Sequence, residues 1–341
     1  MLMDQEKNKV QILATPNAHV LVLGKSGMGK TYFICRELEQ QIAAKRSMIL
    51  FDFSGSYTTA ELEKMKFSLM DQINVLNPVQ EQLIWHMDAG QLVSTLTAAF
   101  VNSLQIRSYY QKKLLKEAVQ TAWDDHGTVN IGNVMDSLES MNKEEENETE
   151  TKQNIVHLLT RLELYSETEG IGFCGENRQM KADTKKALTI LQLSELPELQ
   201  RQFFTNLFLE ILWAEIRSKR RAVDIVVLDE FQFMSIHAGT ALSSMLREGR
   251  KFGLGLYLSS QFIGNYEREE VETLLQCGNI LYFRPTIHDI KKVANMIAPE
   301  NAAEWRRILE RLQVGELVLK GAYALNGSQK RLEDLIICRV L

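Results

Sequence analysis

The sequence predicts an α/β protein with a mostly parallel sheet, helices on both faces and an inserted all-α subdomain. Across residues 19–53 an apolar run, a glycine-rich segment, a helical pattern and a second apolar run follow in order, which is a βαβ unit. Short apolar runs separated by helical patterns return after residue 186. Between these regions, apolar residues recur at helical spacing and strand alternation is almost absent. We therefore expect one sheet-based core that a helical insertion interrupts.

The composition limits the function classes. The chain has 341 residues, of which 45% are hydrophobic, so it can bury a large core. Its formal net charge of −5 argues against a protein that coats nucleic acid through its overall charge. It does not exclude a ring-shaped assembly whose inner face alone is basic. No apolar run approaches the ~18 residues that cross a bilayer, and the amino-terminal segment is charged. We expect a cytoplasmic protein without a membrane span, peripheral at most to a membrane complex.

The first part of the core is expected over residues 1–78. It contains an apolar strand candidate at His19–Leu23, a helix from about Thr31 and a second strand candidate within Met48–Tyr57. A further apolar stretch ends at an Asn-Pro turn at residue 78. These elements begin a parallel sheet.

The helical insertion is expected over residues 79–175, and the second part of the core over residues 176–341. In the insertion, Leu92, Leu96 and Phe100 fall on one helical face. The second part of the core holds a long amphipathic helix and five strand candidates, the helix at about 197–221 and the strands at 187–193, 223–228, 254–259, 279–283 and 316–320.

A phosphate-binding loop connects the first strand candidate to the first helix. The segment fits the pattern G-x-x-x-x-G-K-[ST] with the residues Gly24, Lys25, Ser26, Gly27, Met28, Gly29, Lys30 and Thr31. Its glycines let successive backbone N–H groups point into one concavity, and the helix N-terminus adds positive potential for a polyphosphate. Lys30 would reach the β- and γ-phosphates, and the Thr31 hydroxyl would ligate Mg²⁺. The sequence thus predicts binding of a nucleoside triphosphate, ATP, with Mg²⁺.

Two acids follow the strand candidate at residues 223–228. In an open α/β sheet, ligand-binding groups lie at the carboxyl ends of strands, where Asp229 and Glu230 stand. An aliphatic run followed by Asp-Glu is the Walker B pattern. Asp229 would hold Mg²⁺ through water, and Glu230 would orient and deprotonate the attacking water.

A third segment, residues 246–261, reads as a helix ending in cations, a glycine break, a strand and a terminal glutamine. Gln261 suits a residue that senses the γ-phosphate from the neighbouring strand, and a strand cap is the alternative. Arg247 and Arg250 either serve the site or complement the negative end of the helix dipole.

Five motifs in order resemble the HerA/FtsK superfamily of P-loop ATPases, particularly VirB4/TrwB-like conjugation ATPases and HerA-like DNA translocases. They are GKSGMGKT, FDFSGSY, INVLNP, VVLDEFQFM and LREGRKFGLGLYLSSQ, and the resemblance spans about residues 20–320. Two of these motifs distinguish the superfamily from other NTPases, many of which share the two Walker motifs. They are the turn with Asp52, Gly55 and Tyr57 and the segment ending at Gln261. The resemblance implies a RecA-like core with a helical insertion before Walker B, in mostly hexameric rings.

The resemblance also implies residue roles. It makes Lys30, Glu230, Gln261 and Arg250 catalytic, with Arg250 reaching the γ-phosphate of a neighbouring subunit. Arg284 and Arg247 are second choices for that arginine. An arginine supplied by a neighbouring subunit raises turnover by a factor of about 10³–10⁵, so hydrolysis should depend on assembly. Members of the superfamily carry a β-barrel, membrane helices or a DNA-reading module. We expect this chain to be a motor core without them, and partner proteins to supply anchoring and loading.

The leading hypothesis is a homo-hexameric, ATP-dependent motor that translocates DNA without sequence preference, in conjugation, DNA processing or phage defence. One alternative is a VirB4-like energiser of a type IV secretion channel that acts on protein partners. Another is a nucleotide-switched scaffold that recruits an effector such as a nuclease. The basic run Arg217–Arg221 is either surface charge at a helix end or part of a pore that tracks phosphates, and Lys112–Lys116 and Lys291-Lys292 are equally ambiguous.

Overall fold

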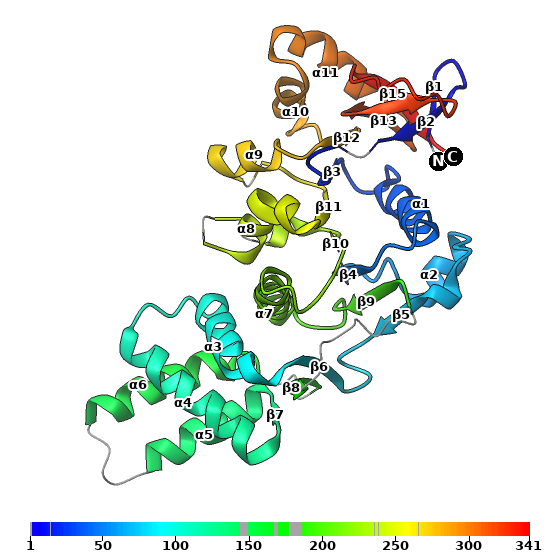
Figure 1. Ribbon diagram of the computed structural model, residues 1–341. Helices are drawn as coiled ribbons and strands as arrows, with labels where there is room; N and C mark the ends of the chain where they lie inside the picture. The colour runs from blue at the N-terminus through cyan, green and yellow to red at the C-terminus, as the bar shows by residue number, and fades with distance from the viewer. Residues whose placement is uncertain are drawn as a thin grey trace. The chain divides into compact units, whose positions relative to one another are not determined.

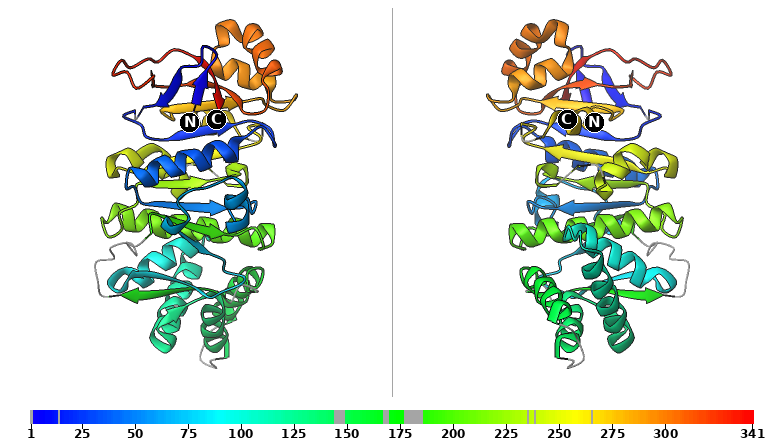
Figure 2. Two further views of the ribbon diagram at one scale, coloured as in Figure 1. Left: turned by 90° about the vertical axis from the view of Figure 1, so that its right-hand side faces the viewer. Right: turned by 90° about the vertical axis from the view of Figure 1, so that its left-hand side faces the viewer.

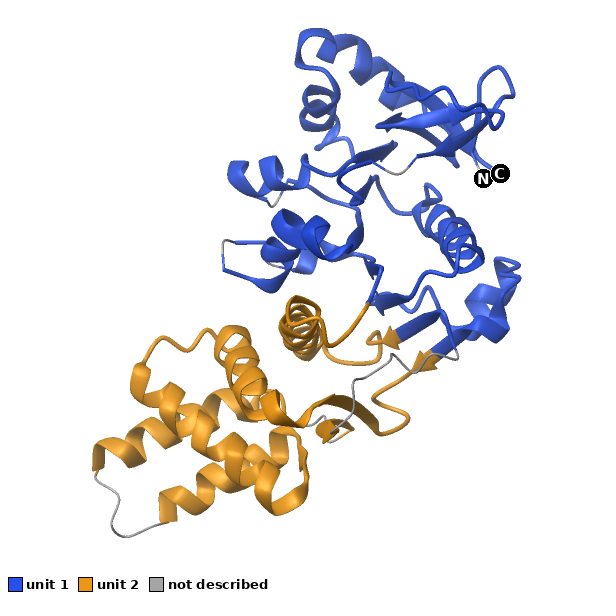
Figure 3. Cartoon of the chain, viewed as in Figure 1, with its two compact units in different colours: residues 1–74, 185–190, 223–341 blue, residues 75–184, 191–222 orange. Residues whose placement is uncertain are grey.

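The structure is a computed structural model that describes residues 2–13, 15–143, 149–166, 170–176, 186–234, 236–237, 239–264 and 266–341. The chain forms two compact units (Figure 3). Unit 1 comprises residues 1–74, 185–190 and 223–341, and unit 2 comprises residues 75–184 and 191–222. The sequence predicts a single insertion over residues 79–175, whereas in the structure the segment 191–222 also groups with it.

A large sheet contains twelve strands in the described part of the chain, in the order β14-β2-β1-β15-β13-β12-β3-β11-β10-β4-β9-β5. Its strands are β1 (Leu2–Asp4), β2 (Lys9–Ile12), β3 (Val20–Leu23), β4 (Met48–Asp52), β5 (Ile73–Leu76), β9 (Leu188–Gln192), β10 (Ile225–Leu228), β11 (Gly255–Ser260), β12 (Asn279–Phe283), β13 (Glu316–Lys320), β14 (Tyr323–Leu325) and β15 (Ile336–Val340). The helices of unit 1 are α1 (Lys30–Ala43), α2 (Thr59–Lys64), α8 (Ala241–Glu248), α9 (Arg268–Leu274), α10 (Ile290–Ile297) and α11 (Ala302–Arg311). Its short 3₁₀ turns are η1 (Met70–Gln72), η3 (Phe231–Phe233), η4 (Gly249–Phe252) and η5 (Pro299–Asn301).

The centre of the sheet is parallel. β12, β3, β11, β10 and β4 are parallel neighbours, with pairs such as Val22 to Ser259 and Val226 to Ile49. Within unit 1, α1 lies on one side of these strands and α8 and α9 lie on the other (Figures 1 and 2). Every residue of β3 and β10 is buried, as expected for parallel strands covered on both faces. The predicted α/β class with a mostly parallel sheet is confirmed.

One end of the sheet is antiparallel. β13, β15, β1, β2 and β14 extend the sheet beyond β12. β15 lies between β13 and β1, so Leu2 pairs with Val340 and the two chain ends lie side by side (Figure 1). The sequence predicts only β13 of these five. The other four have three to five residues, and pairing between opposite ends of the chain leaves no local pattern.

Unit 2 is not all-α, which corrects the sequence prediction. Its helices are α3 (Leu92–Ser103), α4 (Tyr109–His126), α5 (Ile131–Lys143), α6 (Thr149–Glu163) and α7 (Glu198–Arg217), with the 3₁₀ turn η2 (Ala89–Gln91). A second sheet has the order β6-β8-β7, from β6 (Leu83–Asp88), β8 (Ile171–Glu176) and β7 (Thr128–Val129). In β6 the side chains of Leu83, Trp85 and Met87 are buried and alternate with half-exposed ones. The strand has only six residues, so its two-residue alternation is hard to detect in a sequence region dominated by long helical patterns.

Helix α7 completes the core of unit 2. The ring of Phe208 lies 5.3 Å from that of Trp85 in β6 and 5.8 Å from that of Phe173 in β8, measured between centroids. Phe203 packs on Phe100 of α3 at 6.3 Å. These aromatic contacts explain why segment 191–222 groups with the insertion rather than with the sheet core. In the described part of the chain, no helix is long and apolar enough to cross a membrane.

Candidate functional site

The predicted phosphate-binding loop connects β3 to α1 at the carboxyl end of the parallel strands of unit 1 (Figure 1). Three backbone hydrogen bonds attach the loop to neighbouring segments. They run from the Gly24 N–H to the Ser260 carbonyl (3.2 Å), from the Lys25 N–H to the Arg284 carbonyl (2.9 Å) and from the Gly315 N–H to the Met28 carbonyl (2.9 Å). The ends of β11 and β12 and the turn before β13 therefore hold the loop in shape.

At two positions of the loop, the structure explains why the residue is glycine. Gly24 has φ 153°, and a Cβ atom there would lie 2.5 Å from the Cβ of Phe283. Gly29 has φ 101°, the left-handed region that residues with a side chain rarely adopt, and stands as the N-cap of α1. The glycines thus allow the loop to pass close to β12 and to turn into the helix.

The loop presents a row of free backbone donors. Among the described residues, the N–H groups from Ser26 to Tyr32 have no hydrogen-bond acceptor. Gly29 caps α1 without a side-chain hydrogen bond, so the positive end of the helix is also open. Consecutive unpaired N–H groups at a helix N-terminus fit the oxygens of a polyphosphate. Thr31 is half-buried in the first turn of α1, at the position that a P-loop uses for Mg²⁺.

Lys30 points into the interior rather than into solvent. The residue is 6% exposed, and its Nζ donates a hydrogen bond to the Lys25 carbonyl at 3.2 Å. Burial lowers the pKa of Lys30, and the negative charges of Glu230 and Asp229 oppose that shift. The lysine predicted from the P-loop therefore lies within electrostatic reach of both acids predicted from Walker B.

Asp229 is a buried carboxyl group directly after β10. It is 1% exposed, and burial raises its pKa to about 6. The hydroxyls of Ser259 and Tyr57 and the charge of Lys30 oppose that rise. Neither hydroxyl makes a hydrogen bond of normal geometry among the described residues. A hydrated Mg²⁺ would stabilise the ionised carboxylate and supply partners to the two hydroxyls, so these groups fit the predicted metal.

The D-x-x-G-x-Y turn delivers Tyr57 to this position. Asp52 Oδ1 accepts hydrogen bonds from the N–H groups of Ser54 (3.2 Å) and Ser56 (3.1 Å), and Oδ2 accepts one from Tyr57 (3.0 Å). Tyr57 is completely buried, and burial followed by the charge of Asp229 raises its pKa well above the usual value. The sequence singles out this turn as a family signature, but its local pattern does not show that the tyrosine meets Asp229.

Glu230 adopts an uncommon backbone conformation, φ 61° and ψ 40°, in the left-handed region. Its Oε1 accepts a hydrogen bond from Nε2 of Gln261 at 2.6 Å, and its Oε2 accepts one from Nε2 of Gln232. The predicted base and the predicted sensor are therefore in direct contact. Gln232 was missed, and no signal in the sequence marks it beyond its place two residues after Glu230.

The three candidate arginines lie outside this cluster. Arg250 in η4 and Arg247 in α8 are exposed, and neither side chain makes an ion pair or hydrogen bond within the described residues. Arg284 is half-buried after β12 and touches the phosphate-binding loop through its carbonyl oxygen. The structure thus joins Lys30, Asp229, Glu230 and Gln261 within one chain and leaves Arg247 and Arg250 on its surface.

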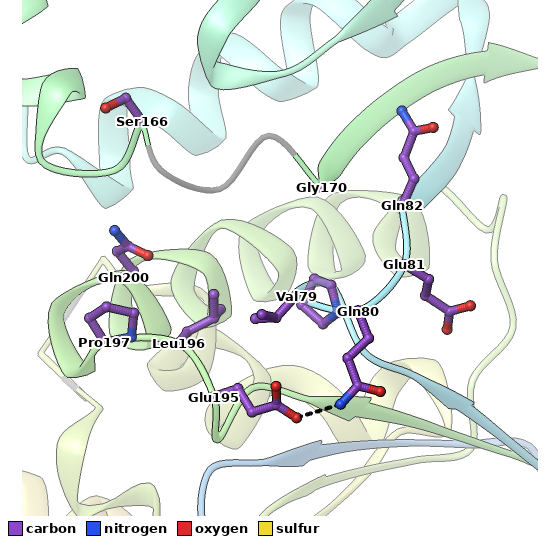
Figure 4. A pocket seen from close by; sticks show the side chains of 11 residues that line it. Val79, Gln80, Glu81, Gln82, Ser166, Gly170, Glu195, Leu196, Pro197 and Gln200 are labelled. Atoms are coloured by element: carbon purple, nitrogen blue, oxygen red, sulfur yellow. Dashed lines mark hydrogen bonds between the residues drawn. The ribbon is translucent and has the colours of Figure 1, made fainter.

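A separate cavity of about 630 Å³ lies within unit 2 (Figure 4). Gln80 Nε2 and Asn77 Nδ2 both donate to Glu195 Oε1 at 2.8 Å, and Figure 4 shows the contact between Gln80 and Glu195. None of the predicted site residues lines this cavity. The free N–H groups and the acids of the predicted nucleotide site all belong to unit 1.

Solved structures with the same fold have low sequence identity to this chain. VirB4 of Thermoanaerobacter pseudethanolicus superposes with a TM-score of 0.66 at 17% identity, over 99% of this chain and 95% of that one. The bacterial conjugative coupling protein TrwB in complex with ADPNP gives a TM-score of 0.63 at 14% identity, over 95% and 85%. TrwB in complex with ADP and Mg²⁺ gives 0.58 at 14% identity, over 93% and 84%. These similarities establish the fold.

Sequence comparison identifies the family. A curated relative, the probable helicase MJ1565 of Methanocaldococcus jannaschii, is 22% identical over 319 residues, which are 89% of this chain and 60% of the relative. The chain thus spans about three fifths of that protein. The model of the DUF87 family, described as the central domain of the helicase HerA, matches residues 2–212. This match covers more than half of the chain, so the chain belongs to the family of the HerA central domain.

Proposed function

We propose that this chain hydrolyses Mg-ATP and couples hydrolysis to movement of DNA as a homo-hexamer. One observation carries the ATPase part. The unpaired N–H groups from Ser26 to Tyr32 stand beside Lys30, whose pKa reflects the charges of Asp229 and Glu230. A triphosphate bound there would supply acceptors to these N–H groups, next to a carboxylate that could act on water.

Each residue of the site has a role in this proposal. The loop N–H groups and Lys30 bind and orient the phosphates, while Thr31 and Asp229 hold Mg²⁺, which neutralises phosphate charge when bound. Glu230 accepts the proton of the attacking water. Gln261 moves its amide from Glu230 to the γ-phosphate when ATP is present.

Two substitutions test the ATPase proposal. Lys30→Ala should abolish binding of Mg-ATP, measured by calorimetry, because the loop loses its cation. Glu230→Gln should keep binding and lower turnover by ~10²-fold or more, because the proton acceptor is lost. Folded wild-type protein that takes up no Mg-nucleotide would contradict the proposal.

The basic run at residues 217–221 is partly occupied by structural contacts within unit 2. Arg221 Nε bonds Glu215 Oε2 at 2.6 Å, and its guanidinium lies 4.6 Å from the centroid of the Trp85 ring. Arg220 pairs with Asp88. Two of the four cations therefore have local partners, which weakens this run as a contact for DNA.

A groove between α10 and α11 is the better candidate surface for DNA. It encloses about 480 Å³, and its lining comprises three cations, three alanines, one amide and one acid: Lys291, Arg306, Arg307, Ala294, Ala302, Ala303, Asn295 and Glu310. Arg306 pairs with Glu310 at 3.0 Å, whereas Lys291 and Arg307 are exposed and have no ion pair among the described residues. Unpaired cations along a groove suit the phosphate backbone without readout of bases.

The DNA proposal predicts a loss of affinity in the double variant Lys291→Glu/Arg307→Glu. The slope of log affinity against log salt should fall in magnitude by about two for each subunit bound, in a fluorescence binding assay. The matched control is Lys9→Glu/Lys330→Glu, two exposed cations outside the groove. ATP turnover that DNA does not stimulate would favour the secretion energiser, and partner recruitment that survives Glu230→Gln would favour the scaffold.

A further inference from the structure

The carboxylate of Glu230 is held from both sides by side-chain amides. Gln261 Nε2 donates to Oε1 at 2.6 Å, and Gln232 Nε2 donates to Oε2. Each oxygen of the proposed base therefore has one of its two lone-pair sites taken by an amide. A carboxylate with a donor on each oxygen is confined to one orientation, and each donor lowers the basicity of the oxygen that it contacts.

The two donors differ in how firmly they are held. The other end of Gln232 is anchored, because its Oε1 accepts hydrogen bonds from Ser260 Oγ at 2.9 Å and from the backbone N–H of Gln261 at 3.3 Å. The side-chain amide of Gln261 has Glu230 as its one partner within the described residues. Gln261 can therefore turn away while Gln232 stays in place.

The turn that carries Gln232 is also fixed. Gln232 lies in η3, and the ring of Phe231 in the same turn stacks on Tyr266 with centroids 5.6 Å apart. The Tyr266 hydroxyl donates to the Phe231 carbonyl at 2.9 Å. The backbone from which Gln232 projects is thus fastened to the segment that follows β11.

We propose that Gln232 is a positioning residue for hydrolysis, an inference that rests on the proposed ATPase function. When the amide of Gln261 moves to the γ-phosphate, Gln232 keeps Oε2 and leaves Oε1 free. Oε1 then takes a proton from the attacking water, whose oxygen bonds the γ-phosphorus while the bond from phosphorus to the bridging oxygen breaks and ADP leaves. Gln232 thereby fixes the orientation of the carboxylate and makes Oε1, which then has no amide donor, the more basic oxygen.

Two substitutions separate positioning from a structural role. Gln232→Glu keeps an acceptor for Ser260 and for the N–H of Gln261, but loses the amide donor to Glu230. Gln232→Met removes both the amide donor and the acceptor oxygen while it keeps a similar side-chain volume. Gln11→Glu, on an exposed position of β2, is the control for the added charge.

We expect Gln232→Glu and Gln232→Met each to lower kcat at least tenfold at pH 8, with the dissociation constant of ATP changed less than threefold. A protonated carboxyl group can donate as the amide does. The kcat of Gln232→Glu relative to wild type should therefore rise at least threefold from pH 8 to pH 6, while that of Gln11→Glu and Gln232→Met stays constant. A kcat of either Gln232 variant equal to wild type, or a constant ratio for Gln232→Glu, overturns the inference.

A second measurement does not depend on turnover. In protein with ¹⁵N-labelled glutamine, Glu230→Ala should shift the side-chain amide signals of both Gln232 and Gln261, because each loses its acceptor. Unshifted Gln232 signals overturn the inference on their own. Absence of turnover in wild-type protein rejects the proposed function, and the amide spectra still decide whether the contact exists.

Discussion

At the scale of single residues, the buried carboxylate of Asp229 lowers the stability of the free protein, although the proposed function requires it. It is 1% exposed, and burial raises its pKa to about 6 from the usual value of 3.8. A carboxyl group whose pKa is higher in the folded state binds protons more tightly there, so stability falls as pH rises between these two values. Above pH 6 the buried charge costs on the order of 1–3 kcal/mol in the absence of a cation.

Asp229→Asn should therefore stabilise the nucleotide-free protein while it abolishes ATP turnover. The expected gain is on the order of 1–3 kcal/mol at pH 7.5 and should shrink as pH falls from 6 towards 4. Urea unfolding at a series of pH values measures it. A destabilised variant at pH 7.5, or a gain independent of pH, would show that the carboxylate is compensated in the free protein.

Tyr57→Phe tests the hydroxyl beside Asp229. The hydroxyl is buried beside Asp229 and makes no hydrogen bond of normal geometry among the described residues, so its loss should change stability by less than ~1 kcal/mol. If it orders the water of a bound Mg²⁺, the Mg²⁺ concentration for half-maximal turnover should rise several-fold. Tyr282→Phe is the matched control, because Tyr282 is equally buried with an unpartnered hydroxyl in β12. Equal Mg²⁺ dependence in both variants would remove Tyr57 from the metal site.

At the scale of elements, one buried arginine ties the residues after α7 to β6. Arg221 bonds Glu215 at 2.6 Å and donates through Nη2 to the His86 carbonyl at 2.8 Å. The side chains of Arg221 and Glu215 are 10% and 6% exposed. Burial raises the pKa of Glu215, and the charge of Arg221 lowers it. Removal of one partner leaves an uncompensated charge inside unit 2.

Arg221→Met should destabilise the protein by about 3–5 kcal/mol, measured by thermal or urea unfolding. The double variant Arg221→Met/Glu215→Met should recover much of that loss, because no buried charge remains. Arg220→Met is the control: its pair with Asp88 is about one third exposed, and its loss should cost under ~1 kcal/mol. Equal effects of the Arg220 and Arg221 single variants would contradict this account.

The elements also show what a sequence can predict. Strands covered on both faces, such as β3 and β10, are apolar runs that local pattern reveals. The two-residue period of β6 is not evident among the surrounding helical patterns. β1 and β15 form by pairing between distant segments, which local sequence does not reveal. In the site, Lys30, Asp229 and Glu230 belong to motifs. Gln232 contacts Glu230 within one turn and is anchored by Ser260 at the end of β11, and only the three-dimensional arrangement shows these contacts.

At the scale of the whole molecule, assembly is the outstanding prediction. Arg250 is exposed and lacks an ion pair among the described residues, as a residue that serves a neighbouring subunit would be. We expect Arg250→Ala to bind ATP normally and to lose turnover by ~10³-fold or more.

Complementation between subunits gives the sharper measurement. Lys30→Ala subunits keep Arg250, and Arg250→Ala subunits keep the phosphate-binding loop. A mixture of the two inactive proteins should therefore recover turnover wherever an intact loop faces an intact arginine. The same mixture made with Arg247→Ala tests the second candidate. Arg250→Ala with wild-type turnover, or mixtures without recovery, would remove Arg250 from the role.

The position of β15 has a consequence for biosynthesis. Because β15 lies between β1 and β13, β1 cannot join the sheet until residue 340 has left the ribosome. The Gly315 N–H, which contacts the phosphate-binding loop at Met28, precedes β13 directly. The nascent chain should therefore acquire nucleotide affinity late, and β1 and β2 should wait as an unpaired hairpin that chaperones or a neighbouring polypeptide can capture.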